Sequence, residues 1–142
     1  YKLWMRKTTK KTMPKTAKKP TRSKLVKKLD VVFSKYIRLS SADKRGMCTC
    51  VTCGKQYHWK NIQAGHFMSR KHYSTRWDES NVKPQCCGCN MFKQGEQYKY
   101  SLFLGSELSN ELYLKSKETV KFSTTDLELM IDEYNTKLKP FL

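Results

Sequence analysis

The sequence predicts an α+β fold in which a small ββα core is flanked by helices at both ends. Two CxxC pairs, Cys50/Cys53 and Cys86/Cys89, enclose a stretch that contains short alternating, strand-like segments. Four thiolates can close a tetrahedral zinc site, so we expect the pairs to hold this stretch together. Outside it, apolar residues recur at three- and four-residue steps, which is the periodicity of helices that pack on a core.

Length and charge indicate one domain with a polyanionic partner. At 142 residues the chain is most simply one domain with extensions, and we expect a basic flexible arm over 1–22 and a single domain over 23–142. Residues 1–95 hold 23 Lys/Arg against 4 Asp/Glu, a net charge of +19, whereas residues 96–142 have a net charge of −2. This excess favours nucleic acid as the partner. The arm would add nonspecific, salt-sensitive affinity, whether it stays solvated or orders on DNA.

Cysteine usage and hydropathy bear on where the protein works. The six cysteines could form three disulfides in a secreted chain. Two CxxC pairs in a Lys-rich chain without a signal peptide instead favour zinc in a reducing compartment. No run approaches the roughly 18 apolar residues that cross a bilayer. We therefore expect a cytoplasmic protein with no membrane partner.

The first helix is expected over 23–40, with Ser23 as its N-cap. Its apolar stripe consists of Leu25, Leu29, Val32, Phe33, Tyr36 and Ile37. The stripe predicts core packing, although the stripes over 25–37 and 127–138 could also supply a dimer interface. The basic side chains on the remaining face are candidate phosphate contacts or simply solvated, and they include Lys24, Lys27 and Lys28.

The zinc-bound ββα core is expected over 48–104. Its first strand would carry the alternating residues Tyr57, Trp59 and Ile62. His66 would lie on the second strand or at its end, residues 69–84 would form an irregular basic loop, and a helix would begin at Asn90. The side chains expected to be buried on this helix are Phe92, Tyr98, Leu102 and Phe103.

Two acidic helices are expected to close the chain over 105–142. Ser106 would cap the first, and Thr125 with Glu128 would form the capping box of the second. The apolar residues of the first helix are Leu108, Leu112 and Tyr113, and those of the second are Leu127, Ile131, Tyr134 and Leu138. Both helices are expected to be structural.

The spacing of the cysteines selects four of the six as zinc ligands. The expected ligands are Cys50, Cys53, Cys86 and Cys89. Cys48 and Cys87 are left over because each breaks the two-residue spacing. A shift by one residue at either pair, or a set of unpaired buried thiols, is the alternative.

Among the three histidines, only His66 has neighbours at an informative spacing. A single histidine is more often structural, and that interpretation is kept for His58 and His72. Asn81 follows His66 by fifteen residues, and Asn90 comes directly after the last zinc cysteine. The order of a His, an Asn and a final His or Asn beside a zinc half-site resembles the HNH, or ββα-metal, nucleases.

A closer resemblance lies in four motifs, which are Ala64–Phe67, Arg76–Val82, Gln85–Asn90 and Lys93–Gly95. They are similar to the Rap/NinG family of phage recombination endonucleases, and the position of Asn90 also resembles phage endonuclease VII. The resemblance implies a structure-selective DNA endonuclease for branched recombination intermediates such as D-loops, forks and Holliday junctions. It further implies a Mg²⁺ or Mn²⁺ ion, a phage- or prophage-encoded protein in the host cell, and recombination proteins as partners.

The resemblance also implies roles for individual residues. His66 would take a proton from the attacking water, and Asn81 would orient His66 by accepting a hydrogen bond from its other ring nitrogen, directly or through its backbone. Asn90 would hold the catalytic ion, with His66 as a weaker candidate ligand. The candidate phosphate contacts in this region are Arg70, Lys71, Arg76 and Lys93.

One departure from the HNH pattern is Gly65, where many such enzymes carry an aspartate that binds the ion. The nearest acidic residues are Asp78 and Glu79, for which a loop or capping role is the commoner one. Two other functions stay open: a non-catalytic, zinc-stabilised DNA-binding module, which needs neither His66 nor Asn90, and an RNA-binding or ribosome-associated zinc ribbon. The last leaves the spacing of His66, Asn81 and Asn90 unexplained.

Overall fold

The computed structural model describes residues 18–142, so most of the arm expected over 1–22 lies outside the described residues. The helices are α1 (Arg22–Ser41), α2 (Tyr73–Arg76), α3 (Gln97–Leu104), α4 (Ser106–Ser116) and α5 (Thr124–Leu138). The strands are β1 (Met47–Thr49), β2 (Gln56–His58), β3 (Gln63–His66) and β4 (Val82–Gln85). Short helical turns occur at η1 (Glu79–Asn81), η2 (Gly88–Phe92) and η3 (Lys139–Phe141). The predicted α+β class is confirmed.

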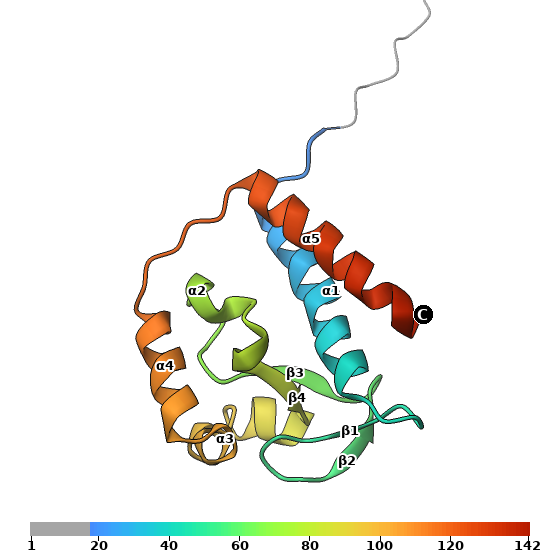
Figure 1. The fold of residues 1–142 in the computed structure, drawn as a ribbon, viewed down its shortest axis with the longest axis vertical. Coiled ribbons are helices and arrows are strands. Elements are labelled where there is room, and N and C mark those ends of the chain that lie inside the picture. The colour runs from blue at the N-terminus through green and yellow to red at the C-terminus, as the bar shows by residue number, and fades with distance from the viewer. Residues whose placement is uncertain (1–17) are drawn as a thin grey trace, which may run out of the picture.

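The main core lies between α1 and α5, which run side by side in Figure 1. The buried residues of both predicted stripes belong to one cluster, and the Phe33 and Tyr134 rings meet edge to face with their centroids 5.0 Å apart. The stripes therefore cover each other within one chain, and the alternative of a dimer interface built from them is wrong. The cap of α1 is Thr21, whose hydroxyl accepts the Lys24 N–H, rather than Ser23.

The four strands form two antiparallel pairs, β1 with β2 and β3 with β4. In the second pair His66 lies opposite Val82. The expected irregular loop over 69–84 is therefore wrong at its end, where β4 begins. Pro84 made this segment look unlike a strand, but in a two-stranded sheet a proline can face the side without a partner. The first predicted strand is shorter than expected: β2 stops at His58 and does not reach Trp59 or Ile62.

The segment after β4 also differs from the expected helix that begins at Asn90. A π-helical turn forms first, and α3 starts only after Gln94 and Glu96, which have φ values of 53° and 48°. The four side chains expected to be buried are exposed, one in the π-helical turn and three on α3. Those are Phe92, Tyr98, Leu102 and Phe103. Tyr100 is buried instead, and its hydroxyl donates to the Gly65 carbonyl.

The C-terminal helices lie where the sequence predicts, with shifted caps. Gly105 rather than Ser106 is the N-cap of α4. Ser123 and Asp126 form the capping box of α5, two residues before the predicted one. Phe122 packs its ring against Trp77, which fixes the chain just before this cap. Within residues 18–142, no helix combines the length and apolar character that a membrane span requires.

Candidate functional site

The four predicted zinc ligands come together in the fold. The Sγ atoms of Cys50, Cys53, Cys86 and Cys89 lie within 4.8 Å of one another. Zn–S bonds of about 2.3 Å place the sulfurs of a tetrahedral site about 3.8 Å apart. The Cys53 and Cys86 sulfurs are 3.8 Å apart, and all six cysteines are free thiols. The cluster can therefore hold a zinc ion.

The thiols of the cluster have unlike surroundings, and backbone N–H groups favour the thiolate of Cys50. The Cys86 N–H donates to the Cys50 sulfur over 3.3 Å, and the Cys89 N–H donates to the Cys86 sulfur over 3.5 Å. Burial raises the pKa of Cys50, but the Cys86 and Cys53 N–H groups outweigh it and lower the pKa to about 6. Burial and the neighbouring thiols raise the pKa of Cys89 to about 12. Four thiolates so close together need a cation to share their charge.

The two remaining cysteines have other surroundings. Cys48 is fully buried, its thiol donates to the Arg38 carbonyl over 3.1 Å, and burial raises its pKa. Cys87 is exposed, and its thiol points to the Met91 sulfur. Neither belongs to the cluster, so the alternative of a one-residue shift is wrong.

His66 and Asn90 line the same cleft, which has a volume of about 620 Å³. The cleft lies between α1, β3 and the segment that follows the last zinc cysteine. Its polar lining includes Asp30, Arg38, Gln63, His66, Arg70 and Asn90. Two of the three predicted catalytic residues thus share one cleft, whereas Asn81 does not line it.

The His66 ring is oriented by a backbone carbonyl. Its Nε2 lies 2.8 Å from the Arg76 oxygen. A carbonyl only accepts, so Nε2 carries the hydrogen and the neutral ring has its free lone pair on Nδ1. Nδ1 has no partner within the described residues and is not one of their buried unsatisfied atoms, so it reaches solvent. Burial lowers the pKa of His66 below 6.5 against the opposing effect of the Arg76 carbonyl, which favours a neutral imidazole at pH 7.

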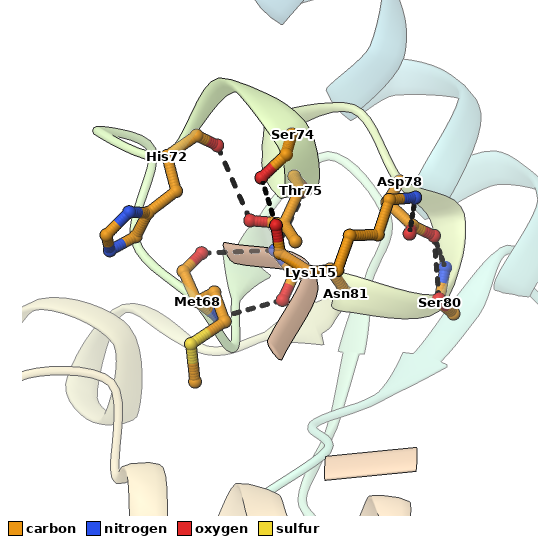
Figure 2. A network of polar contacts seen from close by, with 8 residues as sticks. All are labelled: Met68, His72, Ser74, Thr75, Asp78, Ser80, Asn81 and Lys115. Atoms are coloured by element: carbon orange, nitrogen blue, oxygen red, sulfur yellow. Dashed lines mark hydrogen bonds and ion pairs between the residues drawn. The ribbon is translucent and has the colours of Figure 1, made fainter. Parts of the chain in front are cut away.

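Asn81 has a different role from the predicted one. It is fully buried, its Oδ1 accepts the Met68 N–H over 2.8 Å, and its Nδ2 donates to the carbonyls of Met68 and Thr75 (Figure 2). Its backbone carbonyl accepts from Phe67. The prediction that Asn81 orients His66, directly or through its backbone, is therefore wrong. Asn81 instead ties together the loop that carries the Arg76 carbonyl.

Asp78 and Glu79 also belong to this loop and are not ion ligands at the cleft. The Asp78 carboxylate accepts from the Ser80 N–H, the Ser80 hydroxyl and the Lys115 ammonium, the last over 2.7 Å (Figure 2). Burial raises the pKa of Asp78, but these donors outweigh it and lower the pKa overall. Glu79 pairs with Lys137 over 3.5 Å. Their capping and loop roles are thus the ones observed.

Asn90 presents a free oxygen to the cleft. Its Nδ2 donates to the Gln63 side-chain oxygen over 2.8 Å, which orients the amide, and its Oδ1 has no partner within the described residues. In the described part of the chain, only the cysteine cluster gathers three or more His, Cys, Asp or Glu ligand atoms. A Mg²⁺ or Mn²⁺ ion at Asn90 would therefore depend on water and phosphate oxygens, which Mg²⁺ accepts readily.

Gly65 leaves no room for the carboxylate of the HNH pattern. A Cβ atom there would lie 2.1 Å from the Gln85 side-chain oxygen. Gln85 is fully buried, and its Nε2 donates to the Thr52 hydroxyl and the Gly95 carbonyl. Gln85 thus connects the turn between Cys50 and Cys53 with Gly95, which follows the second CxxC pair. A buried glutamine beside a glycine across a strand pair becomes visible only once the strand register is known.

The basic candidates divide into free and engaged side chains. Arg70, Lys71 and Lys93 are exposed and form no ion pair within the described residues, but only Arg70 lines the cleft. Arg76 is not free to clamp a phosphate, because its guanidinium forms two hydrogen bonds to Asp30, over 3.1 and 2.5 Å. The exposed lysines of α1 are Lys24, Lys27 and Lys28.

Asp30 is a cleft residue that the sequence reasoning missed. Its carboxylate lines the cleft from α1 and also accepts from the Trp77 ring N–H. It is the only acidic residue among the first 42. A single carboxylate on a strongly basic helix, on the side of its apolar stripe, is the signal that could have identified it.

The remaining histidines have structural contacts. His58 accepts the Lys60 N–H and lies against Gly46, where a Cβ would come within 2.8 Å of its ring. His72 is the N-cap residue of α2, and its carbonyl accepts from Thr75 (Figure 2). Neither lines the cleft, in agreement with the structural interpretation.

Comparison with known protein families gives a match over nearly the whole chain. Residues 4–141 match the family model described as "NinG: Bacteriophage Lambda NinG protein". The matched region includes the cysteine cluster and every residue that lines the cleft. Neither the curated proteins nor the solved structures yielded a match.

Proposed function

Because the chain belongs to the family described as Bacteriophage Lambda NinG protein, we propose that it is a divalent-metal-dependent endonuclease that nicks branched DNA intermediates of recombination. One observation carries the proposal: His66 and Asn90 line the same cleft, and each keeps a free lone-pair atom, Nδ1 and Oδ1. A general base and an ion ligand are the two parts that hydrolysis of a phosphodiester needs.

The proposed catalytic unit is a ββα-metal core of the HNH type. It comprises β3, β4 and the helical segment from η2 to α3, which occur in this order in the chain, with α2 and η1 between the two strands. His66 ends the first strand, and Asn90 lies in the helical part directly after Cys89. The zinc site would hold these parts together, since a small basic domain gains folding free energy from a structural metal.

In the proposed reaction, His66 accepts a proton from the attacking water at Nδ1 while Nε2–H stays bonded to the Arg76 carbonyl. Asn90 would hold a Mg²⁺ or Mn²⁺ ion through Oδ1, and the bound ion supplies Lewis-acid polarisation of the phosphate and stabilisation of the leaving 3′ oxygen. Arg70, on the rim of the cleft, would contact a phosphate of the bound strand.

The proposal also includes the binding partner of the protein and the place where it acts. The partner would be branched DNA, bound largely through phosphate contacts from the basic part of the chain. The site of action would be the cytoplasm of the bacterial host of a phage or prophage, together with recombination proteins. The non-catalytic DNA-binding module is the second candidate, and it is favoured by the absence of a carboxylate at Gly65.

The test is a cleavage assay on linear duplex, D-loop, fork and four-way-junction DNA with Mg²⁺ and with Mn²⁺. We expect nicking of the branched substrates, and a loss of roughly 10² to 10⁴ in rate for His66→Ala with DNA binding in Ca²⁺ unchanged. His72→Ala is the matched control and should cleave normally, because His72 lies outside the cleft. Cleavage by His66→Ala at the wild-type rate would refute the role of His66. Inertness of the wild-type protein on all four substrates would favour the DNA-binding module.

A further inference from the structure

We infer that Asp30 is a positioning residue for His66, which it holds in its reactive orientation through the peptide unit between Arg76 and Trp77. The inference rests on the proposed function, because the orientation of His66 matters for catalysis only if His66 takes a proton. It gives α1, which lies outside the proposed ββα unit, a direct role in orienting His66.

The Asp30 carboxylate binds two consecutive side chains. Its Oδ1 accepts from the Arg76 Nε over 3.1 Å and from the Trp77 Nε1 over 3.0 Å, and its Oδ2 accepts from an Arg76 terminal nitrogen over 2.5 Å. The Asp30 and Arg76 side chains are 19% and 14% exposed. A two-point, charge-assisted pair shielded in this way is stronger and more directional than an exposed ion pair.

The held peptide unit carries the atom that orients the base. The carbonyl of Arg76 belongs to the peptide bond that joins Arg76 to Trp77, and it accepts the His66 Nε2–H over 2.8 Å. Both side chains that flank this bond are thus fixed by one carboxylate. The other terminal nitrogen of Arg76 donates to the Arg70 carbonyl over 2.8 Å, which leaves the guanidinium little freedom.

The segment that carries this carbonyl needs outside support. The α2 helix has four residues, and a helix of one turn is not stable by itself. Its C-terminal carbonyls have no partners inside the helix, which leaves the Arg76 carbonyl free for His66. Asp30 comes from a twenty-residue helix that packs on α5, so it transfers the rigidity of the main core to the base.

Asp30 also lines the cleft, so the rival role is that of an ion ligand. Both of its oxygens are occupied by Arg76 and Trp77, which argues against that role. The two roles predict different kinetics: loss of a positioning residue lowers kcat, whereas loss of an ion ligand raises the Mg²⁺ concentration needed for half-maximal rate.

The test compares Asp30→Asn with the wild-type full-length protein by cleavage kinetics and by ¹⁵N NMR of the His66 imidazole. We expect kcat to fall roughly tenfold to a hundredfold, with KM for DNA and the Mg²⁺ requirement within about twofold of wild type. The wild-type ring should be the Nε2–H tautomer, and the variant should show a mixture of tautomers. Asp30→Glu keeps the charge and should recover part of kcat. Asp132→Asn, on an exposed position of α5, is the matched control and should change neither readout.

Three results would overturn the inference: an unchanged tautomer and kcat in Asp30→Asn, a selective rise in the Mg²⁺ requirement, or a failure of Asp30→Glu to recover any activity in a folded protein. If Asp30→Asn does not fold, Trp77→Phe removes the indole donor and part of a buried ring but keeps the Asp30–Arg76 pair, and in a folded protein it should still lower kcat and disturb the tautomer. If the wild-type protein cleaves no DNA, the proposed nuclease fails, and the NMR comparison decides separately whether Asp30 orients His66.

Discussion

At the scale of single residues, the cleft is defined by what each polar atom is already bonded to. His66 and Asn90 each use one side-chain nitrogen to bind a neighbour, and this leaves Nδ1 and Oδ1 free. Arg76 and Asn81, by contrast, have no free polar group of this kind, because their side chains hold the loop between β3 and β4. Residue type alone therefore does not distinguish the side chains that keep a free polar atom from those that hold the loop.

Asn90 provides a test of ion binding. Asn90→Ala removes the proposed Oδ1 ligand, and we expect the Mg²⁺ concentration for half-maximal cleavage to rise by roughly one to two orders of magnitude, the usual range for loss of a metal-site interaction. Asn90→Asp should lower it instead, because a carboxylate binds Mg²⁺ more strongly than an amide. Gln63→Ala frees the Asn90 amide without removing the ligand and should have a smaller effect. An unchanged Mg²⁺ requirement in Asn90→Ala would show that the ion binds elsewhere.

Gly65 provides a test of packing beneath the cleft. Gly65→Ala should destabilise the protein by about 1–3 kcal/mol, because the added Cβ overlaps the buried Gln85 side chain. The double variant Gly65→Ala with Gln85→Ala removes the obstacle, so its destabilisation should be smaller than the sum of the two single effects. Urea unfolding measures all three. If the two single effects simply add, the Gln85 side chain moves aside in Gly65→Ala without a cost in free energy.

At the scale of elements, sequence patterns predicted the long helices well and the segments around the zinc site less well. The stripes of α1 and α5 were correct because a long amphipathic helix repeats its signal over many turns. β4 was missed because four residues that include Pro84 carry a weak strand signal. The helix after Asn90 was misplaced because a π-helical turn at the last zinc knuckle rotates the chain before α3 begins.

The candidate site shows the same division. The cluster of four cysteines was predictable because a CxxC pair is local in the sequence. The pairing of Arg76 with Asp30 joins residues 46 positions apart, and no local pattern shows it. Arg76 was therefore predicted to be a phosphate contact because of its charge alone.

The zinc knuckles can be tested as a unit. We expect one zinc ion per chain in the wild-type protein, measured by metal analysis after purification. Cys53→Ser should lose this zinc and lower the melting temperature, because the knuckle and the hairpin beside it have few other buried contacts. Cys87→Ser is the matched control and should retain one zinc ion, since Cys87 lies outside the cluster. Full zinc content in Cys53→Ser would show that the fourth ligand is another group.

At the scale of the whole molecule, the excess positive charge lies in the same part of the chain as the proposed functional site. The cysteine cluster and the cleft belong to the basic part, residues 1–95, whereas α4 and α5 belong to the part with a net charge of −2. The acidic helices are packed as supports, α5 against α1 and α4 against α2 and α3. We therefore expect DNA to reach the cleft across the basic part of the chain and not across α4 and α5.

The contribution of the basic N-terminus can be measured by salt dependence. Residues 1–17 contain six Lys/Arg and no acidic residue. Removing one contact to a phosphate of duplex DNA reduces the magnitude of the slope of log K against log salt by roughly 0.9. We expect a variant that lacks these residues to bind junction DNA more weakly, with a shallower slope, and to keep its preference for branched over linear substrates. The preference should persist because phosphate contacts supply affinity rather than selectivity.

The matched control for this truncation is the pair of substitutions Lys121→Ala and Lys139→Ala, which remove exposed positive charge from the acidic part of the chain. These should leave the slope unchanged if DNA contacts only the basic part. An unchanged slope in the truncated protein would mean that residues 1–17 do not touch the phosphates. A loss of the preference for branched DNA would instead assign part of the recognition of branch points to these residues.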